Sequence, residues 1–357
     1  MTERYYIATP IAPGNFAGTK ARQDIEALAE RRGLRRIEFA GGSTADRRPI
    51  ERVRLAWLGL RNWIRLERTV APASLVLFQY PHYPMKSAML ARFMMRRIRR
   101  VKRVRFAALV HDLNSARKSF GRAARYSDAR FLPQFDFVIC HNERMRGALA
   151  ARGIAPERLI PLGVFDYLCE GGAPADAPYA PSVNVAGNLS REKSAYLYAL
   201  LLTPRRYRVY LYGAGLDAAA GGESASYEGF APPERLPRLL KGAFGLVWDG
   251  DSLDTCAGGF GVYLALNNPH KLSLSLSAGL PVVIWSGASL APYVEEHGLG
   301  LCVGSLRELD AALEGVSAED YRSMRQNAAR EGEKIRGGYY FDRAMDVLER
   351  RCFKEFF

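Results

Sequence analysis

The sequence predicts an α/β protein made of two consecutive domains, each with a parallel sheet covered by helices. The chain has 357 residues, which at about 150 residues per domain corresponds to two domains. Short apolar runs alternate with helical patterns in both halves, and a stretch rich in glycine and proline separates the halves. The composition, 48% apolar and 25% charged, is typical of a globular chain and excludes a mainly disordered, collagen-like or coiled-coil protein.

The first half contains six short apolar runs that are typical of buried parallel strands. They are Tyr5–Ala8, Ile37–Ala40, Leu75–Gln79, Phe106–Val110, Phe137–Cys140 and Leu159–Leu162. Apolar residues at helical spacing precede Gly33 and fill 53–66 and 89–98, so helices are expected between the strands. This alternation predicts a doubly wound sheet over residues 1–165.

Residues 166–181 contain two glycines and three prolines and are interpreted as a linker. The alternation then restarts in a second domain over residues 182–340. We expect strands at Val183–Ala186, Val209–Tyr212, Tyr227–Gly229, Phe244–Trp248, Val282–Trp285 and Gly300–Val303, and helices at about 191–202, 233–241, 269–279, 288–297 and 305–314. Residues 341–357 carry an apolar stripe at helical spacing, which predicts a separate C-terminal helix.

The charge balance indicates an anionic partner. Lys and Arg number 51 and Asp and Glu number 37, so the net charge is +14. The partner classes are a nucleic acid, an anionic membrane surface and a phosphorylated substrate; no recognised nucleic-acid-binding module is present, so nucleic acid is not expected. The segment Arg92–Arg105 holds eight cations interleaved with Met and Phe, and is either a solvated helix face or a peripheral contact with anionic lipid.

Cysteine usage and the N-terminus suggest a cytoplasmic protein. The five cysteines are scattered without a CxxC pair, which indicates reduced thiols and no zinc site. The first residues lack the pattern of a signal peptide. Residues 272–294 are uncharged and long enough to span a bilayer, but Gly279, Pro281 and Gly287 divide them into helix, turn and strand. Any membrane contact is therefore expected to be peripheral, at the inner face.

Two strand-to-helix corners of the second domain are candidates for anion binding. In the first, Gly187 and Asn188 lead to Ser190 as the expected N-cap, which places Arg191 and Lys193 in the first helical turn. Cations at a helix N-terminus are disfavoured by about 0.3–1 kcal/mol each unless an anion binds there.

The second corner repeats this pattern. Asn268 is the expected N-cap and Pro269 suits the first helical position, so His270 and Lys271 fall in the first turn. Solvated, merely tolerated cations would explain one such corner, but two in one domain favour a diphosphate site.

Glycines mark two further candidates. Tyr212 and Gly213 follow a strand, where the backbone either makes a plain turn or approaches a nucleotide whose base the aromatic ring covers. Gly18 and Lys20 open the first helix and form either an ordinary helix start or a phosphate contact.

Two polar segments have alternative interpretations. His111 and Asp112 end a strand and supply either a general base or a structural histidine; being adjacent on an extended chain, at most one of them faces the cleft. Asp249–Asp254 is either a polar loop or a metal site, and the glycine-rich stretch 256–267 is expected to be a mobile loop over the cleft.

Taken in order, these segments resemble a bacterial group of GT-B glycosyltransferases, which includes beta-1,6-galactofuranosyltransferases and the glucosyltransferases that extend GlcNAc on serine-rich adhesins. The resemblance covers nearly the whole chain. Its most specific segments are Ala17–Ala21 with Asp24 and Ile25, His111–Leu113, His141 and Asn142 with Met145, Phe165–Leu168, Phe244–Gly250, Asn267–Leu274 and Ala278–Trp285.

The resemblance implies two Rossmann-like domains facing a cleft, with the C-terminal helix crossing back to the first, acceptor-side domain. It implies a UDP-sugar donor carrying a hexose or galactofuranose, and a lipid-linked or protein-linked glycan acceptor in cell-surface polysaccharide or glycoprotein assembly. It also implies a homo-oligomer with neither a metal nor a cofactor. The alternative is a catalytically silent nucleotide-sugar-binding or scaffold subunit of a glycan-assembly complex.

Roles for the candidate residues follow from the motifs and the resemblance together. Lys271 and Arg191 would stabilise the diphosphate leaving group. The other donor-side residues would be Gly187, Asn188, Tyr212, Gly213, Asn268, His270 and Ser273, with Gly18 and Lys20 reaching over from the first domain. Asp112 or His111 would remove a proton. The Glu-x7-Glu run of many retaining relatives is absent from the helix that contains Lys271, so both stereochemical outcomes stay open.

Overall fold

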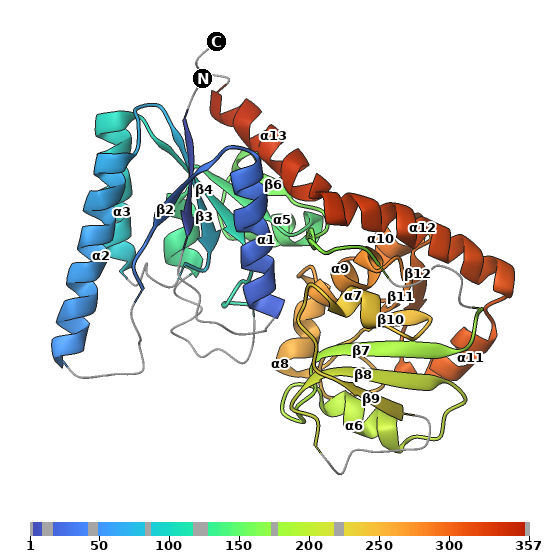
Figure 1. Ribbon diagram of the computed structural model, residues 1–357. Helices are drawn as coiled ribbons and strands as arrows, with labels where there is room; N and C mark the ends of the chain where they lie inside the picture. Colours follow the sequence, from blue (N-terminus) through green and yellow to red (C-terminus); the bar gives the residue numbers. More distant parts are fainter. Residues whose placement is uncertain are drawn as a thin grey trace.

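The computed structural model describes residues 3–8, 17–41, 49–82, 87–116, 128–172, 178–217 and 225–353. Within these ranges the chain forms two sheets of six parallel strands, each in its own domain, and the two domains lie side by side (Figure 1). This is the predicted GT-B arrangement of two Rossmann-like units.

The sheet of the first domain has the strand order β2-β1-β3-β4-β5-β6. Its strands are β1 (Arg4–Ala8), β2 (Arg35–Glu38), β3 (Leu75–Tyr80), β4 (Arg105–Val110), β5 (Phe137–Cys140) and β6 (Leu159–Pro161). The helices are α1 (Ala17–Arg31), α2 (Pro49–Thr69), α3 (Ala88–Lys102) and α5 (Glu143–Ala150), with 3-10 turns η1 (Leu132–Gln134) and η2 (Pro156–Arg158). All six residues of β3 are buried, as its apolar sequence predicts for a central strand. Strand β2 begins two residues earlier than predicted.

The sheet of the second domain has the order β12-β11-β10-β7-β8-β9. Its strands are β7 (Ser182–Asn188), β8 (Arg208–Ala214), β9 (Ala225–Gly229), β10 (Phe244–Val247), β11 (Val282–Trp285) and β12 (Gly300–Val303). Its helices are α6 (Ala195–Leu202), α7 (Leu236–Leu239), α8 (Gly258–Gly261), η3 (Val262–Ala265), α9 (His270–Ser277), α10 (Ala291–Glu296), η4 (Leu306–Glu308) and α11 (Leu309–Glu314).

Two C-terminal helices connect the domains. The sequence did not predict α12 (Ala318–Gly337), which packs against α9 in the second domain. Its buried face includes the small residues Ala328 and Gly332, and a Cβ at Gly332 would lie 2.2 Å from the carbonyl oxygen of Leu276. Gly338, with φ 85°, then separates α12 from α13 (Tyr339–Phe353).

Helix α13 crosses back to the first domain, as expected. Glu349 pairs with Arg4 at 2.9 Å, and Asp346 pairs with Arg32 at 2.7 Å. The expected helix began at residue 341 and ran to 357; the observed one begins at Tyr339, and residues 354–357 lie outside the described chain.

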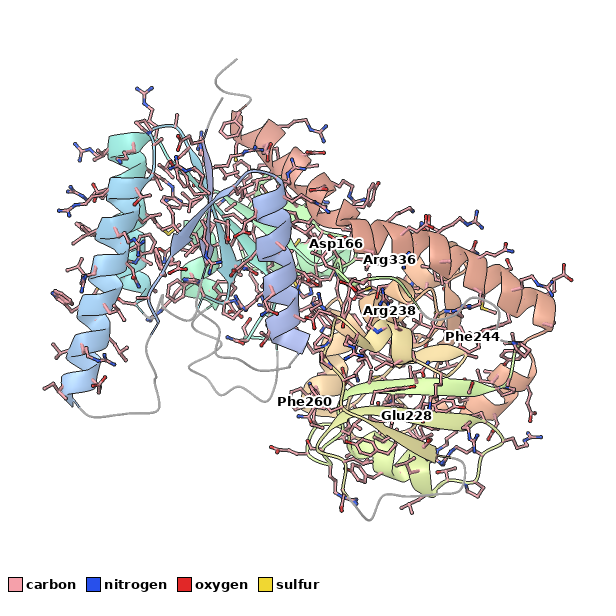
Figure 2. The ribbon with its side chains drawn as sticks, viewed as in Figure 1. Asp166, Glu228, Arg238, Phe244, Phe260 and Arg336 are labelled. Atoms are coloured by element: carbon pink, nitrogen blue, oxygen red, sulfur yellow. The ribbon has the colours of Figure 1, made fainter. Side chains whose placement is uncertain are left out.

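The start of α13 is fixed by the segment between the domains. The buried Asp166 carboxylate accepts hydrogen bonds from the backbone N–H groups of Tyr340 at 3.2 Å and Phe341 at 2.7 Å, at the junction of the two long helices (Figure 2). Burial raises the pKa of Asp166 to about 7, although both N–H donors act in the opposite direction. The first residues of the expected linker are thus packed into the structure.

Among the described residues, no helix is both long and apolar enough to cross a membrane. The uncharged stretch 272–294 divides among α9, β11 and α10, as its glycines and proline predict.

Candidate functional site

The carboxyl ends of β4 and β5 in the first domain lie against residues 263–289 of the second. The Asn142 side chain donates to Oδ1 of Asn268 at 2.7 Å and to Oγ of Ser289 at 3.0 Å. The Asn268 side chain donates to the carbonyl oxygens of His141 and Gly163, at 2.8 and 2.9 Å. Asn268 therefore joins the domains; it does not cap α9, whose N-cap residue is Pro269. Asn268 therefore has a structural role, and its expected contact with the donor stays a prediction.

His141 belongs to the same buried contact. Its Nδ1 accepts a hydrogen bond from the backbone N–H of Asn268 at 2.9 Å, so the proton sits on Nε2, which donates to the carbonyl oxygen of Val110 at 3.0 Å. Burial lowers the pKa of His141 to about 3. The imidazole is neutral at physiological pH.

Three histidine rings surround Phe165 between the domains. The ring of His111 stacks on it at 5.7 Å, that of His270 at 4.8 Å, and His141 meets it edge-on at 4.9 Å. Burial lowers the pKa of His270 to about 4 and that of His111 well below its usual value. His111 also bonds through Nε2 to Oε1 of Gln79 at 2.7 Å, and Asp112 follows it at the end of β4. The first domain thus faces the cleft with neutral imidazoles.

In the second domain, Lys271 provides a half-buried cation. His270 and Lys271 occupy the first turn of α9, as the sequence predicts. The Lys271 ammonium donates to the carbonyl oxygen of Trp248 and to Oδ1 of Asp249, both at 2.7 Å. Burial alone would lower the pKa of Lys271, but the Asp249 carboxylate raises it above its usual value. Gly187 lies next to it, since a Cβ there would be 3.8 Å from Cε of Lys271.

Several buried polar atoms around this corner have no hydrogen-bond partner. Within the described ranges they are both ring nitrogens of His270, Oδ1 of Asn267 and the hydroxyl of Tyr196. Tyr196 is fully buried and its pKa is influenced by the charges of Lys271 and Asp249, which places it beside them. A buried polar atom without a partner costs about 1–3 kcal/mol, so this corner suits a polar ligand. No pattern in the sequence marks Tyr196 as functional, because it looks like one more apolar residue of α6.

The expectation for Arg191 is wrong. Helix α6 begins at Ala195 with Ser194 as its N-cap, so residues 191–193 form a turn before the helix. Asn188 causes this, because its Oδ1 accepts from the backbone N–H of Ser190 at 2.9 Å. The Arg191 guanidinium lies 4.1 Å from the ring centre of Tyr198, pairs with Asp217 at 3.5 Å and is 64% exposed. Of the two corners that predicted a diphosphate site, only the one at the start of α9 still supports it.

The expectation for Tyr212 and Gly213 is also wrong. The Tyr212 ring is 2% exposed, and its hydroxyl donates to the carbonyl oxygen of Leu239 and accepts from the N–H of Lys241. It therefore has no free face for a base. A Cβ at Gly213 would lie 1.8 Å from the Gly187 carbonyl oxygen, so glycine is required here by the pairing of β7 with β8.

The first-domain candidates lie close to the α9 corner. Gly18 is in the first turn of α1. Lys20 is buried, pairs with Asp24 and donates to the carbonyl oxygen of Leu168 at 2.6 Å, so it holds α1 against the segment between the domains. Burial raises the pKa of Asp24 to about 6. The charge of Lys20 contributes to the low pKa of His270, which places α1 near the second domain, and Ser273 is buried inside α9.

The segment 256–267, expected to be a mobile loop, is structured. It forms α8 and η3, and the Tyr263 hydroxyl accepts from the N–H of Leu113 in the first domain at 2.8 Å. Asp249 pairs with Lys271, and Asp254 pairs with Arg307 at 2.6 Å. No group of three His, Cys, Asp or Glu side chains suited to a metal occurs in the described part of the chain.

Comparisons with known proteins agree with this architecture. The model of the glucosyltransferase 3-like N-terminal domain matches residues 4–164, and that of the C-terminal domain matches residues 183–347. Beta-1,6-galactofuranosyltransferase WbbI of Escherichia coli (strain K12) is 34% identical over 256 residues, which are 70% of this chain and 72% of that protein. Glucosyltransferase 3 of Streptococcus gordonii is 29% identical over 232 residues, 60% of this chain and 63% of that protein.

Solved structures share the fold. HepE from Anabaena in complex with UDP and glucose superimposes with a TM-score of 0.63 at 14% identity, over 98% of this chain and 100% of that one. The lipopolysaccharide outer core galactosyltransferase WaaB in its apo form gives 0.59 at 12% identity, with coverage of 98% and 100%. The fold and site thus define a GT-B glycosyltransferase. More specifically, the chain belongs to the glucosyltransferase 3-like family.

Proposed function

We propose that the protein transfers a sugar from a UDP-sugar to a glycan acceptor, with the diphosphate bound at the start of α9. The observation that carries this proposal is that buried, unpartnered polar atoms of His270 and Asn267 occur at the start of α9, together with that of Tyr196 close to the Lys271 cation. The relatives, a galactofuranosyltransferase and a glucosyltransferase, support the reaction class, and the structure of HepE contains UDP and glucose.

Lys271 would stabilise the UDP leaving group. Its ammonium stands in the first turn of α9, where free backbone N–H groups add their partial positive charge. Asp249 holds the ammonium in place at 2.7 Å and keeps it charged. Negative charge grows on the diphosphate as the glycosidic bond breaks, so a fixed cation stabilises the transition state more than the ground state. Because Lys271 supplies this charge, we propose that neither a metal ion nor a cofactor is needed.

His270 would recognise a hydroxyl group of the donor sugar. A neutral imidazole has one donor and one acceptor nitrogen, and both are unpartnered here. A hydroxyl group donates and accepts at once, whereas a phosphate oxygen only accepts, so the ring suits the sugar better than the diphosphate.

Asp112 or His111 would take the proton from the acceptor hydroxyl. Both lie at the end of β4, on the first-domain side of the cleft. Gln79 fixes the ring of His111 at 2.7 Å, which would suit a positioning role for His111 beside Asp112 as the base. A lipid-linked or protein-linked glycan as acceptor, and assembly as a homo-oligomer, complete the proposal.

Calorimetry with UDP tests the donor site. Lys271→Ala should weaken UDP binding roughly 10- to 100-fold, because a charged hydrogen-bond donor is lost. Arg206→Ala is the matched control, since Arg206 is an exposed cation of the same domain that pairs only with Glu314 in the described chain. Unchanged UDP affinity in Lys271→Ala would refute the assignment. UDP binding without donor hydrolysis or transfer across a panel of UDP-sugars would favour the silent scaffold instead.

A further inference from the structure

Helix α2 has an exposed apolar stripe that the fold does not cover. Five residues recur at intervals of three and four: Ile50, Val53, Trp57, Leu60 and Ile64. Their exposed fractions run from 72% at Ile50 to 36% at Ile64. The opposite face of α2 buries Trp63 and Leu66 against the sheet, so the core does not need the stripe. A contiguous apolar face of this kind marks a contact with another surface.

Cations border the stripe. Arg54, Arg61, Arg65 and Arg68 lie along α2, and the Arg61 guanidinium lies 4.7 Å from the ring centre of Trp57. Helix α3 stands beside α2, tied to it by the ion pair of Arg97 with Glu67 at 3.0 Å. Together the two helices contain eleven Arg or Lys residues and two Glu.

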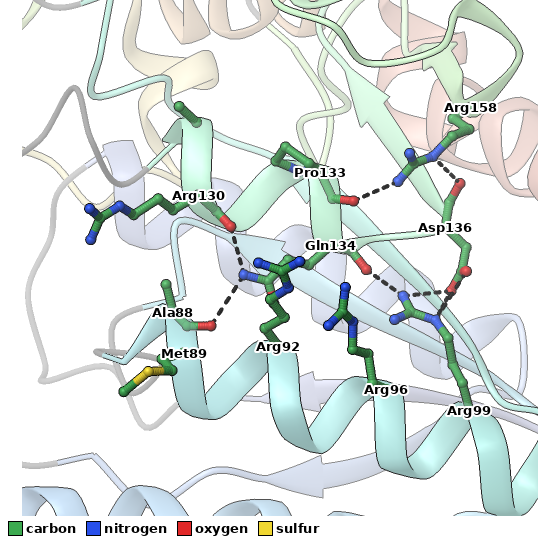
Figure 3. A pocket seen from close by; sticks show the side chains of 11 residues that line it. Ala88, Met89, Arg92, Arg96, Arg99, Arg130, Pro133, Gln134, Asp136 and Arg158 are labelled. Carbon is green, nitrogen blue, oxygen red and sulfur yellow. Dashed lines mark hydrogen bonds and ion pairs between the residues drawn. The ribbon is translucent and has the colours of Figure 1, made fainter.

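Helix α3 also carries exposed apolar residues and cations. Met89 and Phe93 are 83% and 62% exposed. Beyond them, a cavity of about 750 Å³ opens between α3 and residues 129–136 (Figure 3). The arginines that line it are Arg92, Arg96, Arg99, Arg130 and Arg158.

Not all of these arginines are engaged with the protein. Arg99 is held by the Asp136 carboxylate at 3.0 Å, and Arg158 donates to the backbone carbonyl oxygens of Asp136 and Pro133. Within the part of the chain that the structure describes, Arg92 and Arg96 have neither a hydrogen-bonded nor an ion-paired partner (Figure 3). They are therefore available to a bound anion.

We propose that the α2–α3 face, defined as the apolar stripe of α2 with Met89, Phe93 and the arginine cavity of α3, docks on an anionic lipid bilayer. The stripe enters the headgroup region, and Arg92 and Arg96 bind lipid phosphates. Charge complementarity favours lipid over a second copy of the chain, because two such faces would bring like charges together. The face forms the edge of the first domain away from the second, so docking there does not involve the second domain (Figure 1). This inference does not depend on the donor site.

Co-sedimentation of the full chain with vesicles tests the proposal. Vesicles of phosphatidylcholine containing phosphatidylglycerol should bind the wild-type protein, and vesicles of phosphatidylcholine alone should bind it much less. Arg92→Glu combined with Arg96→Glu should weaken binding about thirtyfold or more, given the usual contribution of each cation near an anionic membrane. Trp57→Ser should also weaken it several-fold.

Matched controls lie in the second domain. Leu202 is 85% exposed and Arg206 is an exposed cation, so Leu202→Ser and Arg206→Glu should leave vesicle binding unchanged. Equal binding to both kinds of vesicle, or to none, would overturn the proposal. So would a loss of oligomers in Trp57→Ser with unchanged vesicle binding, which would make the stripe an interface between copies. Thermal stabilisation by inorganic phosphate that depends on Arg96, without vesicle binding, would instead assign the cavity to a soluble anion.

Discussion

The two sides of the cleft differ in how they use polar groups. The first domain presents His111 and His141, neutral imidazoles that are hydrogen-bonded and packed on Phe165. The second presents a charged lysine together with His270, whose two nitrogens have no partner in the described chain. His141, whose two ring nitrogens are both hydrogen-bonded, helps to join the domains. The unpartnered ring nitrogens of His270 are the ones that we propose bind a ligand.

The largest effect on activity should come from replacing the charged lysine of the second domain. Lys271→Ala should lower kcat/KM for the UDP-sugar by roughly 10²–10³-fold, as is typical for losing one group that stabilises developing negative charge. Steady-state kinetics measures this, and Lys271→Arg should recover part of the activity. A value of kcat/KM within twofold of wild type in Lys271→Ala would contradict the proposal that the second domain supplies the charge used in catalysis.

A substitution at the contact between the two domains should instead lower the free energy of unfolding. Asn268→Ala removes three buried side-chain hydrogen bonds across the domains and should lower the free energy of unfolding by about 2 kcal/mol or more. The hydrogen bond from the backbone N–H of residue 268 to His141 is kept if the local conformation is kept. Urea denaturation would report the change, with Asn327→Ala, a half-buried asparagine within the second domain, as control. If stability held and only UDP affinity fell, Asn268 would belong to the donor site after all.

The neutral state of His141 gives a pH dependence. In the unfolded chain its pKa is about 6.5, whereas burial lowers it to about 3 in the folded protein. The unfolded state therefore takes up a proton first as the pH falls, and the stability that His141 contributes above pH 6.5 is lost toward pH 3, by up to about 1.4 kcal/mol per pH unit. His141→Gln lacks this loss, so the stability gap between wild type and variant should narrow from pH 7 to pH 5. The raised pKa values of Asp24 and Asp166 change the stability in the opposite direction with pH, but both residues are present in wild type and variant, so their effects cancel in the difference. A stability difference between wild type and variant that does not depend on pH would show that the imidazole of His141 is not buried as described.

Two treatments should have the smallest effects. Arg191→Ala should change UDP affinity less than twofold, because Arg191 stacks on Tyr198 at the surface. EDTA should leave the transfer rate unchanged, since Lys271 supplies the positive charge. A large loss in Arg191→Ala would revive the two-corner anion site, and inactivation by EDTA that Mg²⁺ or Mn²⁺ reverses would show that a metal is required.

The sequence predicted the sheets and the α9 corner because those signals are local. Apolar runs mark buried strands, and Asn-Pro-His-Lys marks a helix start whatever surrounds it. The choice of N-cap residue was wrong at both corners: Asn188 turns the chain first so that Ser194 becomes the N-cap of α6, and Pro269 rather than Asn268 is the N-cap of α9. Tyr212 failed because alternation along β8 does not say which face meets the core.

Helix α12 was missed for a different reason. Its buried face includes Ala328 and Gly332, small residues that carry little hydrophobic signal. Small residues are needed on this face because α9 approaches it closely. The two helices are distant in sequence, so no local pattern reveals this contact.

The carboxylate of Asp166 brings the two chain crossings between the domains together. One crossing follows Asp166 itself, and the other is at Gly338, just before the N–H groups that Asp166 accepts from. Helix α12 packs against the second domain and α13 against the first, so both crossings meet at this carboxylate. A rotation of one domain relative to the other would therefore turn about this point, and it would first have to break the hydrogen bonds of Asn142 with Asn268 and of Leu113 with Tyr263.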